Sequence, residues 1–108
     1  MTVVTAPPVE GAVLDGRQAV VLHVDGPLDQ SSVARFQEEL AHAQAGHPDQ
    51  VVVDLAGCTF VDSRALTVLL EGHRRACRHG GVLTLRGCAP RVLRLLSLTG
   101  LRGVFDLG

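Results

Sequence analysis

The stretch Val51-Val52-Val53-Asp54-Leu55, followed after a short loop by Asp62-Ser63, decides the fold of this chain. Its first five residues are mostly apolar and β-branched, which is typical of a central strand covered on both faces. Asp62-Ser63 then stands where a helix must start, because either side chain can accept a hydrogen bond from a free N–H of the first helical turn. A buried strand that leads into a capped helix predicts an α/β domain.

The helix that follows Ser63 has apolar residues at helical spacing. We expect it to turn one face toward the sheet, consisting of Leu66, Leu69, Leu70, His73, Ala76 and Cys77. The side chains expected to point mostly to solvent are Arg64, Thr67, Glu71, Arg74, Arg75 and Arg78. Gly80-Gly81 should end this helix.

On the N-terminal side, residues 9–14 and 19–24 are expected to form two strands of a hairpin, joined by a two-residue turn at Asp15-Gly16. Pro7 and Pro8 donate no backbone hydrogen bonds, so residues 1–8 are predicted to be a flexible N-terminal arm. Residues 9–108 are then predicted to form one domain.

A helix should follow the hairpin, with Ser31 or Ser32 as its cap and an end near Gly46-His47-Pro48. Its expected inner face consists of Val33, Phe36, Leu40 and Ala43.

The C-terminal part should contribute a strand at residues 82–85 and a helix that Pro90 opens and Gly100 closes. Val92, Leu95 and Leu96 should face inward, and residues 104–107 should form a short strand or turn. The order ββαβαβα predicts a single α/β domain with a mixed, partly parallel sheet of four to five strands and three to four helices.

Composition points to a chain that stays in the cytoplasm. The 108 residues suit one domain, and no apolar run approaches the ~18 residues of a membrane span. The first residues show no secretory signal. Three cysteines, Cys58, Cys77 and Cys88, are an odd number without paired spacing, which favours a reducing compartment and small core residues.

Charge is unevenly placed although the formal net charge is only −1. Residues 1–63 hold two Arg against nine acids, and residues 64–108 hold eight Arg against two acids. The uneven charge is either the ordinary charge of solvated helices or a basic docking face for an acidic partner. With three aromatic residues and this net charge, no direct nucleic-acid binding is expected. The absence of Lys suggests a GC-rich bacterial genome as a hypothesis.

Familiar catalytic signatures are missing from the sequence. It contains no Gly-rich phosphate loop and no Gly-x-Ser-x-Gly motif, so we expect no enzymatic activity, no catalytic residue and no cofactor. His73 and Cys77 stand four residues apart and could ligate a metal, but no further ligands are recognisable. Core packing is the preferred interpretation of this pair, and no metal site is predicted.

Residues 51–66, VVVDLAGCTFVDSRAL, resemble the signature of STAS domains, particularly the bacterial anti-sigma factor antagonists. Gly26-Pro27-Leu28-Asp29 resembles the family's Gly-x-Leu-Asp loop, and residues 91–101 resemble its C-terminal helix, which ends in Thr-Gly-Leu. Arg64 and Ala65 stand where the commonest pattern, Asp-Ser-Ser-Gly-Leu, has Ser and Gly.

The resemblance implies a regulator that acts by docking to another protein. Its partner is expected to be an anti-sigma factor with a histidine-kinase-like ATPase fold, which phosphorylates Ser63 and thereby releases the antagonist, while a serine phosphatase resets it. The docking surface implied in this way consists of Leu28, Asp29, Asp62, Ser63, Arg64 and Thr67.

Two other functions remain open at this point. One is a constitutive, unphosphorylated STAS subunit of a transporter or stressosome-like assembly. The other is a nucleotide-binding protein, which the missing phosphate loop disfavours.

Overall fold

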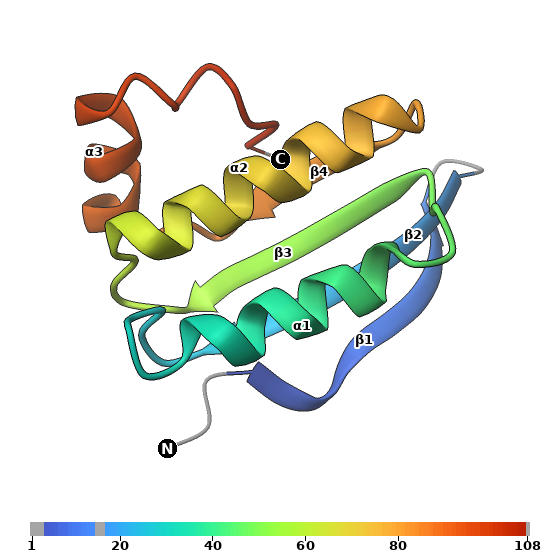
Figure 1. The fold of residues 1–108 in the computed structure, drawn as a ribbon, viewed down its shortest axis with the longest axis horizontal. Helices are drawn as coiled ribbons and strands as arrows, with labels where there is room; N and C mark the ends of the chain where they lie inside the picture. The colour runs from blue at the N-terminus through green and yellow to red at the C-terminus, as the bar shows by residue number, and fades with distance from the viewer. Residues whose placement is uncertain (1–3, 15–16, 108) are drawn as a thin grey trace.

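The computed structural model describes residues 4–14 and 17–107, and the side chains from Ala19 onward (Figure 1). In chain order the elements are β1 (Val4–Leu14), β2 (Arg17–Asp25), α1 (Val33–Gln44), β3 (Gln50–Gly57), α2 (Ser63–Arg78), β4 (Val82–Arg86) and α3 (Pro90–Leu98). This is the ββαβαβα order that the sequence predicts.

The sheet has the strand order β1-β2-β3-β4. β1 is antiparallel to β2, whereas β2, β3 and β4 run parallel to one another. The predicted mixed α/β class is confirmed, with three helices in the described residues. Of the four strands in the sheet, only three are parallel. Within the described part of the chain there is no fifth strand, because the C-terminal segment makes only an isolated bridge between Asp106 and Thr84.

The N-terminal hairpin is confirmed by the antiparallel pairing that runs from Leu14 opposite Arg17 to Val9 opposite Leu22. The expected turn at Asp15-Gly16 lies outside the described residues. β1 begins at Val4 rather than at Val9, and its register shifts between these two residues. A flexible arm at residues 1–8, with the domain boundary after it, stays a prediction.

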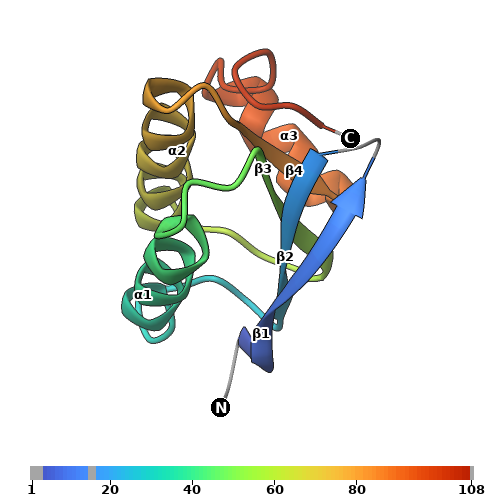
Figure 2. The ribbon, with the colours of Figure 1, turned by 90° about the vertical axis from the view of Figure 1, so that its right-hand side faces the viewer.

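α1 and α2 lie on the same face of the sheet, and α3 lies at the carboxyl end of β4 (Figures 1 and 2). β3 is one of the two inner strands of the sheet, and it places Val51, Val53 and Leu55 in the core. The predicted inner face of α1 is confirmed, because all four of its residues are buried, namely Val33, Phe36, Leu40 and Ala43. None of the helices in the described ranges is long and apolar enough to cross a membrane.

The predicted inner face of α2 is partly wrong. Leu66 and Leu69 are buried as expected, but Cys77 is exposed and His73 and Ala76 are only half-buried. The buried face instead includes the small residues Ala65 and Gly72. In full it consists of Ala65, Leu66, Val68, Leu69 and Gly72. The reason is the close approach of α1: a Cβ on Gly72 would lie 2.8 Å from Leu40 Cδ2.

The cysteines are also not a uniform set of core residues. Cys58 is buried, Cys88 is half-buried and Cys77 is exposed. Burial raises the pKa of both the Cys58 and Cys88 thiols, and the proximity of Cys58 raises the pKa of Cys88 further.

Candidate docking site at the start of α2

The two polar residues at the start of α2 have different structural roles. Asp62 is the N-cap in an extended conformation, and its Oδ1 accepts a hydrogen bond of 2.9 Å from the N–H of Ala65. Ser63 is the first residue of the helix, and its side chain is exposed. Among the described residues the Ser63 hydroxyl has no hydrogen-bond partner. Asp62 therefore caps the helix without help from Ser63, and the exposed Ser63 hydroxyl is accessible to a second protein.

The loop at residues 26–29 is joined to the segment that leads into α2, although the two lie far apart in the sequence. Leu28 and Val61 form a parallel bridge. The N–H of Leu28 donates to the Phe60 carbonyl at 2.8 Å, and the N–H of Asp62 donates to the Leu28 carbonyl at 3.0 Å. The Gly-x-Leu-Asp loop thus lies beside Asp62-Ser63 and belongs to the same surface.

Asp29 is held by the serines that follow it. Its Oδ1 accepts hydrogen bonds from the Ser31 hydroxyl at 2.7 Å and from the Ser31 N–H at 3.0 Å. The bond from the Ser31 hydroxyl is the main cause that lowers the pKa of Asp29 below its ordinary value. The carboxylate therefore stays charged and fixed at the rim of the site.

Ser32 occupies the N-cap position of α1, but the expectation that its side chain caps this helix is wrong. Its hydroxyl donates to the Pro27 carbonyl at 2.9 Å and accepts the N–H of Asp29 at 3.0 Å. Ser32 thereby stabilises the loop that carries Leu28 and Asp29 instead of the first turn of the helix.

The six predicted docking residues differ in their exposure. Ser63, Arg64 and Thr67 are exposed on α2, and Asp29 and Asp62 are half-buried. Leu28 has an exposed fraction of 0%, so its side chain supports the surface from beneath and does not reach the solvent. The Leu28–Val61 bridge brings the loop that carries Leu28 and Asp29 beside the start of α2, and five of the six side chains are exposed or half-buried.

Arg64 and Ala65, the two departures from the family pattern, have opposite environments. Arg64 projects from the exposed side of the first turn of α2. The methyl group of Ala65 has an exposed fraction of 0% and lies in the core. Ala65 is thus part of the packing of α2, whereas Arg64 adds a positive charge beside Ser63.

A polar cluster that the sequence did not single out lies nearby, where three parallel strands end. His23, Asp54 and Arg86 are in register on β2, β3 and β4. Asp54 Oδ2 lies 3.0 Å from Arg86 and 3.2 Å from His23 Nδ1. Partial burial raises the pKa of Asp54, but the Ala56 N–H and Arg86 outweigh it and lower the pKa overall. Only the strand register could have revealed this cluster.

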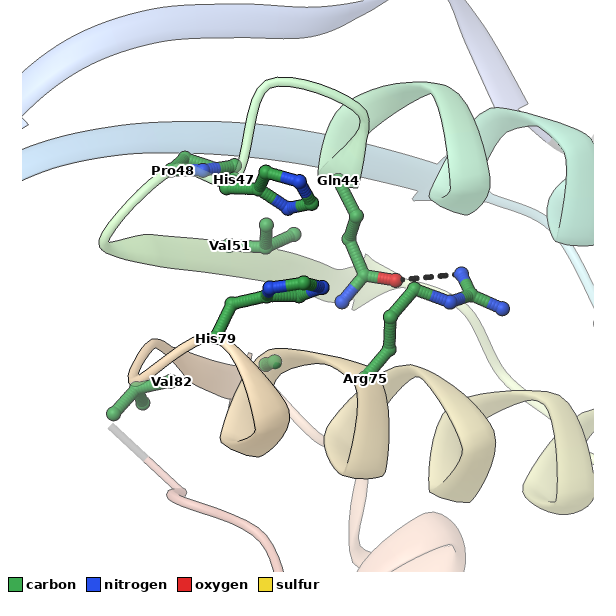
Figure 3. A pocket seen from close by; sticks show the side chains of 8 residues that line it. Gln44, His47, Pro48, Val51, Arg75, His79 and Val82 are labelled. Atoms are coloured by element: carbon green, nitrogen blue, oxygen red, sulfur yellow. Dashed lines mark hydrogen bonds between the residues drawn. The ribbon is translucent and has the colours of Figure 1, made fainter.

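A small pocket lies at the opposite end of the sheet, where α1 and α2 end (Figure 3). The rings of His47 and His79 lie 3.8 Å apart between their centroids. The buried Gln44 accepts a hydrogen bond of 2.9 Å from Arg75 and donates one of 2.8 Å to the Gly72 carbonyl. These contacts fasten α1 to α2, and this pocket has no group in common with the Ser63 site.

The pair His73 and Cys77 is close enough to interact, with Cys77 Sγ 3.7 Å from His73 Nε2. In the part of the chain that the structure describes, no group of three or more His, Cys, Asp or Glu side chains could hold a metal ion. The His73 ring also packs edge-on against Phe105, with 5.7 Å between the centroids.

Known proteins with the same fold support the resemblance noted in the sequence. A family model described as "Mlab, STAS domain" matches residues 13–107. The anti-sigma-B factor antagonist of Bacillus subtilis is 25% identical over 82% of this chain and 80% of its own length. A structure of RsbS from Moorella thermoacetica, carrying a Ser-to-Glu substitution, is 32% identical, with a TM-score of 0.68 over 92% of this chain and 85% of that one.

Two structures of the anti-sigma factor antagonist SpoIIAA have a similar fold. One is the unphosphorylated form, and the other is the phosphorylated form of the Bacillus protein. The unphosphorylated form is 19% identical, with a TM-score of 0.64 over 83% of this chain and 82% of that one. The phosphorylated form is 20% identical, with a TM-score of 0.66 over 92% of this chain and 88% of that one. Because the family model spans all but the ends of the sequence, this chain belongs to the STAS domain family and is anti-sigma factor antagonist-like.

Proposed function

We propose that this protein is an anti-sigma factor antagonist whose binding to an anti-sigma factor kinase is switched off by phosphorylation of Ser63. The observation that carries the proposal is the division of roles at the start of α2: Asp62 caps the helix, and the exposed Ser63 hydroxyl is left unbonded within the described residues. The forms in which SpoIIAA is known, phosphorylated and unphosphorylated, support it.

A phosphate on Ser63 is compatible with the fold. It would add about −1.5 to −2 charges at the positive end of the α2 dipole, where the first turn contains no acidic residue. The fold should therefore tolerate the modification, while a partner docked on Ser63 would meet new bulk and charge beside the Asp29 and Asp62 carboxylates. Arg64 would neutralise part of that charge.

In this account the protein is the substrate of the kinase reaction and not the enzyme. The Ser63 oxygen would form a bond to the γ-phosphorus of ATP held by the partner, ADP would leave, and the hydroxyl proton would pass to a base of the partner. The proposed partner is therefore an ATPase of the histidine-kinase-like fold, and a serine phosphatase would remove the phosphate. Docking is assigned to Asp29, Asp62, Ser63, Arg64 and Thr67, with Leu28 beneath them.

The test is a titration of the cognate ATPase with four forms of this protein. Wild type and Ser63→Ala should bind with similar affinity, whereas Ser63→Asp should bind at least ~10-fold more weakly, or ~1.4 kcal/mol. The phosphorylated protein should bind more weakly still, because its charge is larger than that of Asp.

Ser97→Ala, on α3 and outside the docking surface, is the matched control for loss of an exposed hydroxyl, and it should bind as wild type does. Equal affinities of all four forms would exclude the switch, and a constitutive subunit of a larger assembly would then be the better account. A Ser63→Asp variant that fails to fold would also contradict the proposal, since Asp suits a helix N-terminus.

A further inference from the structure

An apolar groove lies between the loop after β3 and helix α3, and the switch at Ser63 does not explain it. The residues that line it are Phe60, Val61, Arg91, Val92, Arg94, Leu95 and Leu98. Val61 and Val92 are buried and form its floor. Phe60 is 40% exposed and Leu98 is 76% exposed, and these are two of the three large apolar side chains exposed in the described residues. Their clustering in one groove marks an interaction surface.

One face of α3 carries both the apolar and the charged part of this groove. Arg91, Arg94, Leu95 and Leu98 follow the i, i+3, i+4, i+7 spacing and therefore lie on the same side of the helix. No acidic side chain lines the groove, and neither arginine has an ion-pair partner among the described residues.

The two arginines are not placed to stabilise the isolated protein. Arg91 lies in the first turn of α3, at the positive end of the helix dipole, where a cation is unfavourable. Arg94 is three residues further on, so the two like charges also repel each other. An acidic partner would remove both penalties, and this argues that the charges serve binding.

We propose that this groove docks an acidic amphipathic segment of another protein. A large apolar side chain of that segment would enter between Phe60, Leu95 and Leu98, and flanking carboxylates would pair with Arg91 and Arg94. The proposal does not rest on phosphorylation of Ser63.

Two other occupants suit the observations less well. A membrane surface is usually bound by clusters of about four to eight basic residues, and this groove offers two. A second copy of the chain would need an acidic segment with an exposed apolar anchor. Among the described side chains, the exposed large apolar residues are Phe60, Leu98 and Val104. Only Phe60 lies in the acidic part of the chain, residues 1–63, and it already lines the groove.

The experiment is a selection of peptides from a random displayed library against the wild-type protein, with counter-selection against Leu98→Ser. Selected peptides are then labelled and titrated by fluorescence anisotropy. They should combine a large apolar residue with flanking Asp or Glu. Their affinity should fall at least ~10-fold for Leu98→Ser and for the double variant Arg91→Glu/Arg94→Glu. Because these side chains are exposed, the variants should fold.

The double variant Arg35→Glu/Arg74→Glu is the matched control, because it changes two exposed arginines on α1 and α2 by the same charge. It should bind the peptides as wild type does. The proposal is overturned if no peptide family survives the counter-selection, if the survivors are neutral or basic, or if both double variants lose the same affinity. It is equally overturned if the wild type forms a dimer that Leu98→Ser abolishes, or binds anionic vesicles through this groove.

Discussion

Asp62 and Ser63 are neighbours in the chain, yet only the side chain of Asp62 bonds to the backbone of α2. The Asp62 carboxylate accepts the N–H of Ala65, a donor near the start of the helix that would otherwise lack a partner. The Ser63 hydroxyl makes no such bond within the described residues. A helix whose cap does not involve the serine can have that serine modified without losing its first turn.

The first prediction separates these two roles by their effect on stability. Asp62→Ala should lower the free energy of unfolding by about 1 kcal/mol, because it removes the cap. Ser63→Ala should change it by less than about 0.5 kcal/mol, because an exposed, unbonded hydroxyl is lost. Urea denaturation of both variants measures the difference. The reverse order would show that Ser63, and not Asp62, caps the helix.

The second prediction concerns the pH dependence of the Asp54 cluster. Since the pKa of Asp54 is lowered in the folded state, its ionised carboxylate stabilises the fold above the ordinary Asp pKa, and this stability is lost as pH falls through the folded value. Asp54→Asn should therefore be less stable than wild type at pH 7, by about 1 kcal/mol or less because Arg86 is 46% exposed, and equally stable near about pH 2.

Denaturation of wild type and Asp54→Asn across this pH range measures the effect. In the background of Arg86→Gln the difference between Asp and Asn should shrink, because one of the groups that stabilise the Asp54 carboxylate is gone. A stability difference that grows toward low pH would contradict the assignment.

At the scale of single residues, much of the Ser63 site could be predicted from the sequence because its motif is local. Asp62-Ser63 follows a buried strand, so the sequence predicted the start of a helix there, but it left open which of the two side chains is the cap. The burial of Leu28 and the cluster around Asp54 could not be predicted in this way. Both depend on the register between strands, which joins residues about thirty positions apart.

At the scale of elements, α2 shows how small residues determine which face of a helix is buried. Periodicity of large apolar residues correctly identified Leu66 and Leu69, but it placed Cys77 inside. Ala65 and Gly72 carry little hydrophobic signal, yet they are buried because they allow close packing against the sheet and α1. The buried face of α2 thus depends on how closely α1 packs against it. This distance cannot be predicted from the sequence of α2 alone.

The third prediction tests the buried face of α2. Leu69→Ala should cost about 2–5 kcal/mol of unfolding free energy, because Leu69 is 0% exposed and its loss leaves a cavity. Leu98→Ala is the matched control: the same substitution at a side chain 76% exposed should cost less than about 0.5 kcal/mol. Denaturation midpoints compare the two. Equal losses would mean that α2 packs by a different face.

At the scale of the whole molecule, the acidic and basic parts of the sequence form different helices and strands. The acidic part of the chain, residues 1–63, forms β1, β2, α1 and β3, whereas the basic part, residues 64–108, forms α2, β4 and α3. Arg86 pairs across this division with Asp54, but Arg91 and Arg94 border the groove without such a partner among the described residues. Their side chains therefore remain available to other proteins.

The fourth prediction is that the isolated protein binds neither ATP nor GTP tightly and hydrolyses neither. Nucleotide phosphates are usually bound by a Gly-rich loop that leads into a helix, and the sequence has none. The two loops at the Ser63 site are instead joined to each other through Leu28, Phe60 and Asp62. Calorimetric titration with each nucleotide is the measurement, and micromolar binding would support the nucleotide-binding alternative.

The central claim is that Ser63 accepts a phosphate from the protein's partner, and mass spectrometry tests it most directly. The cognate ATPase, incubated with ATP and this protein, should add a single phosphate group, located on the peptide that contains Ser63. Ser63→Ala should remain unmodified, while Ser97→Ala, which removes an exposed hydroxyl on α3 outside the docking surface, should be modified as wild type is. A phosphate at another residue, or equal modification of wild type and Ser63→Ala, would contradict the account.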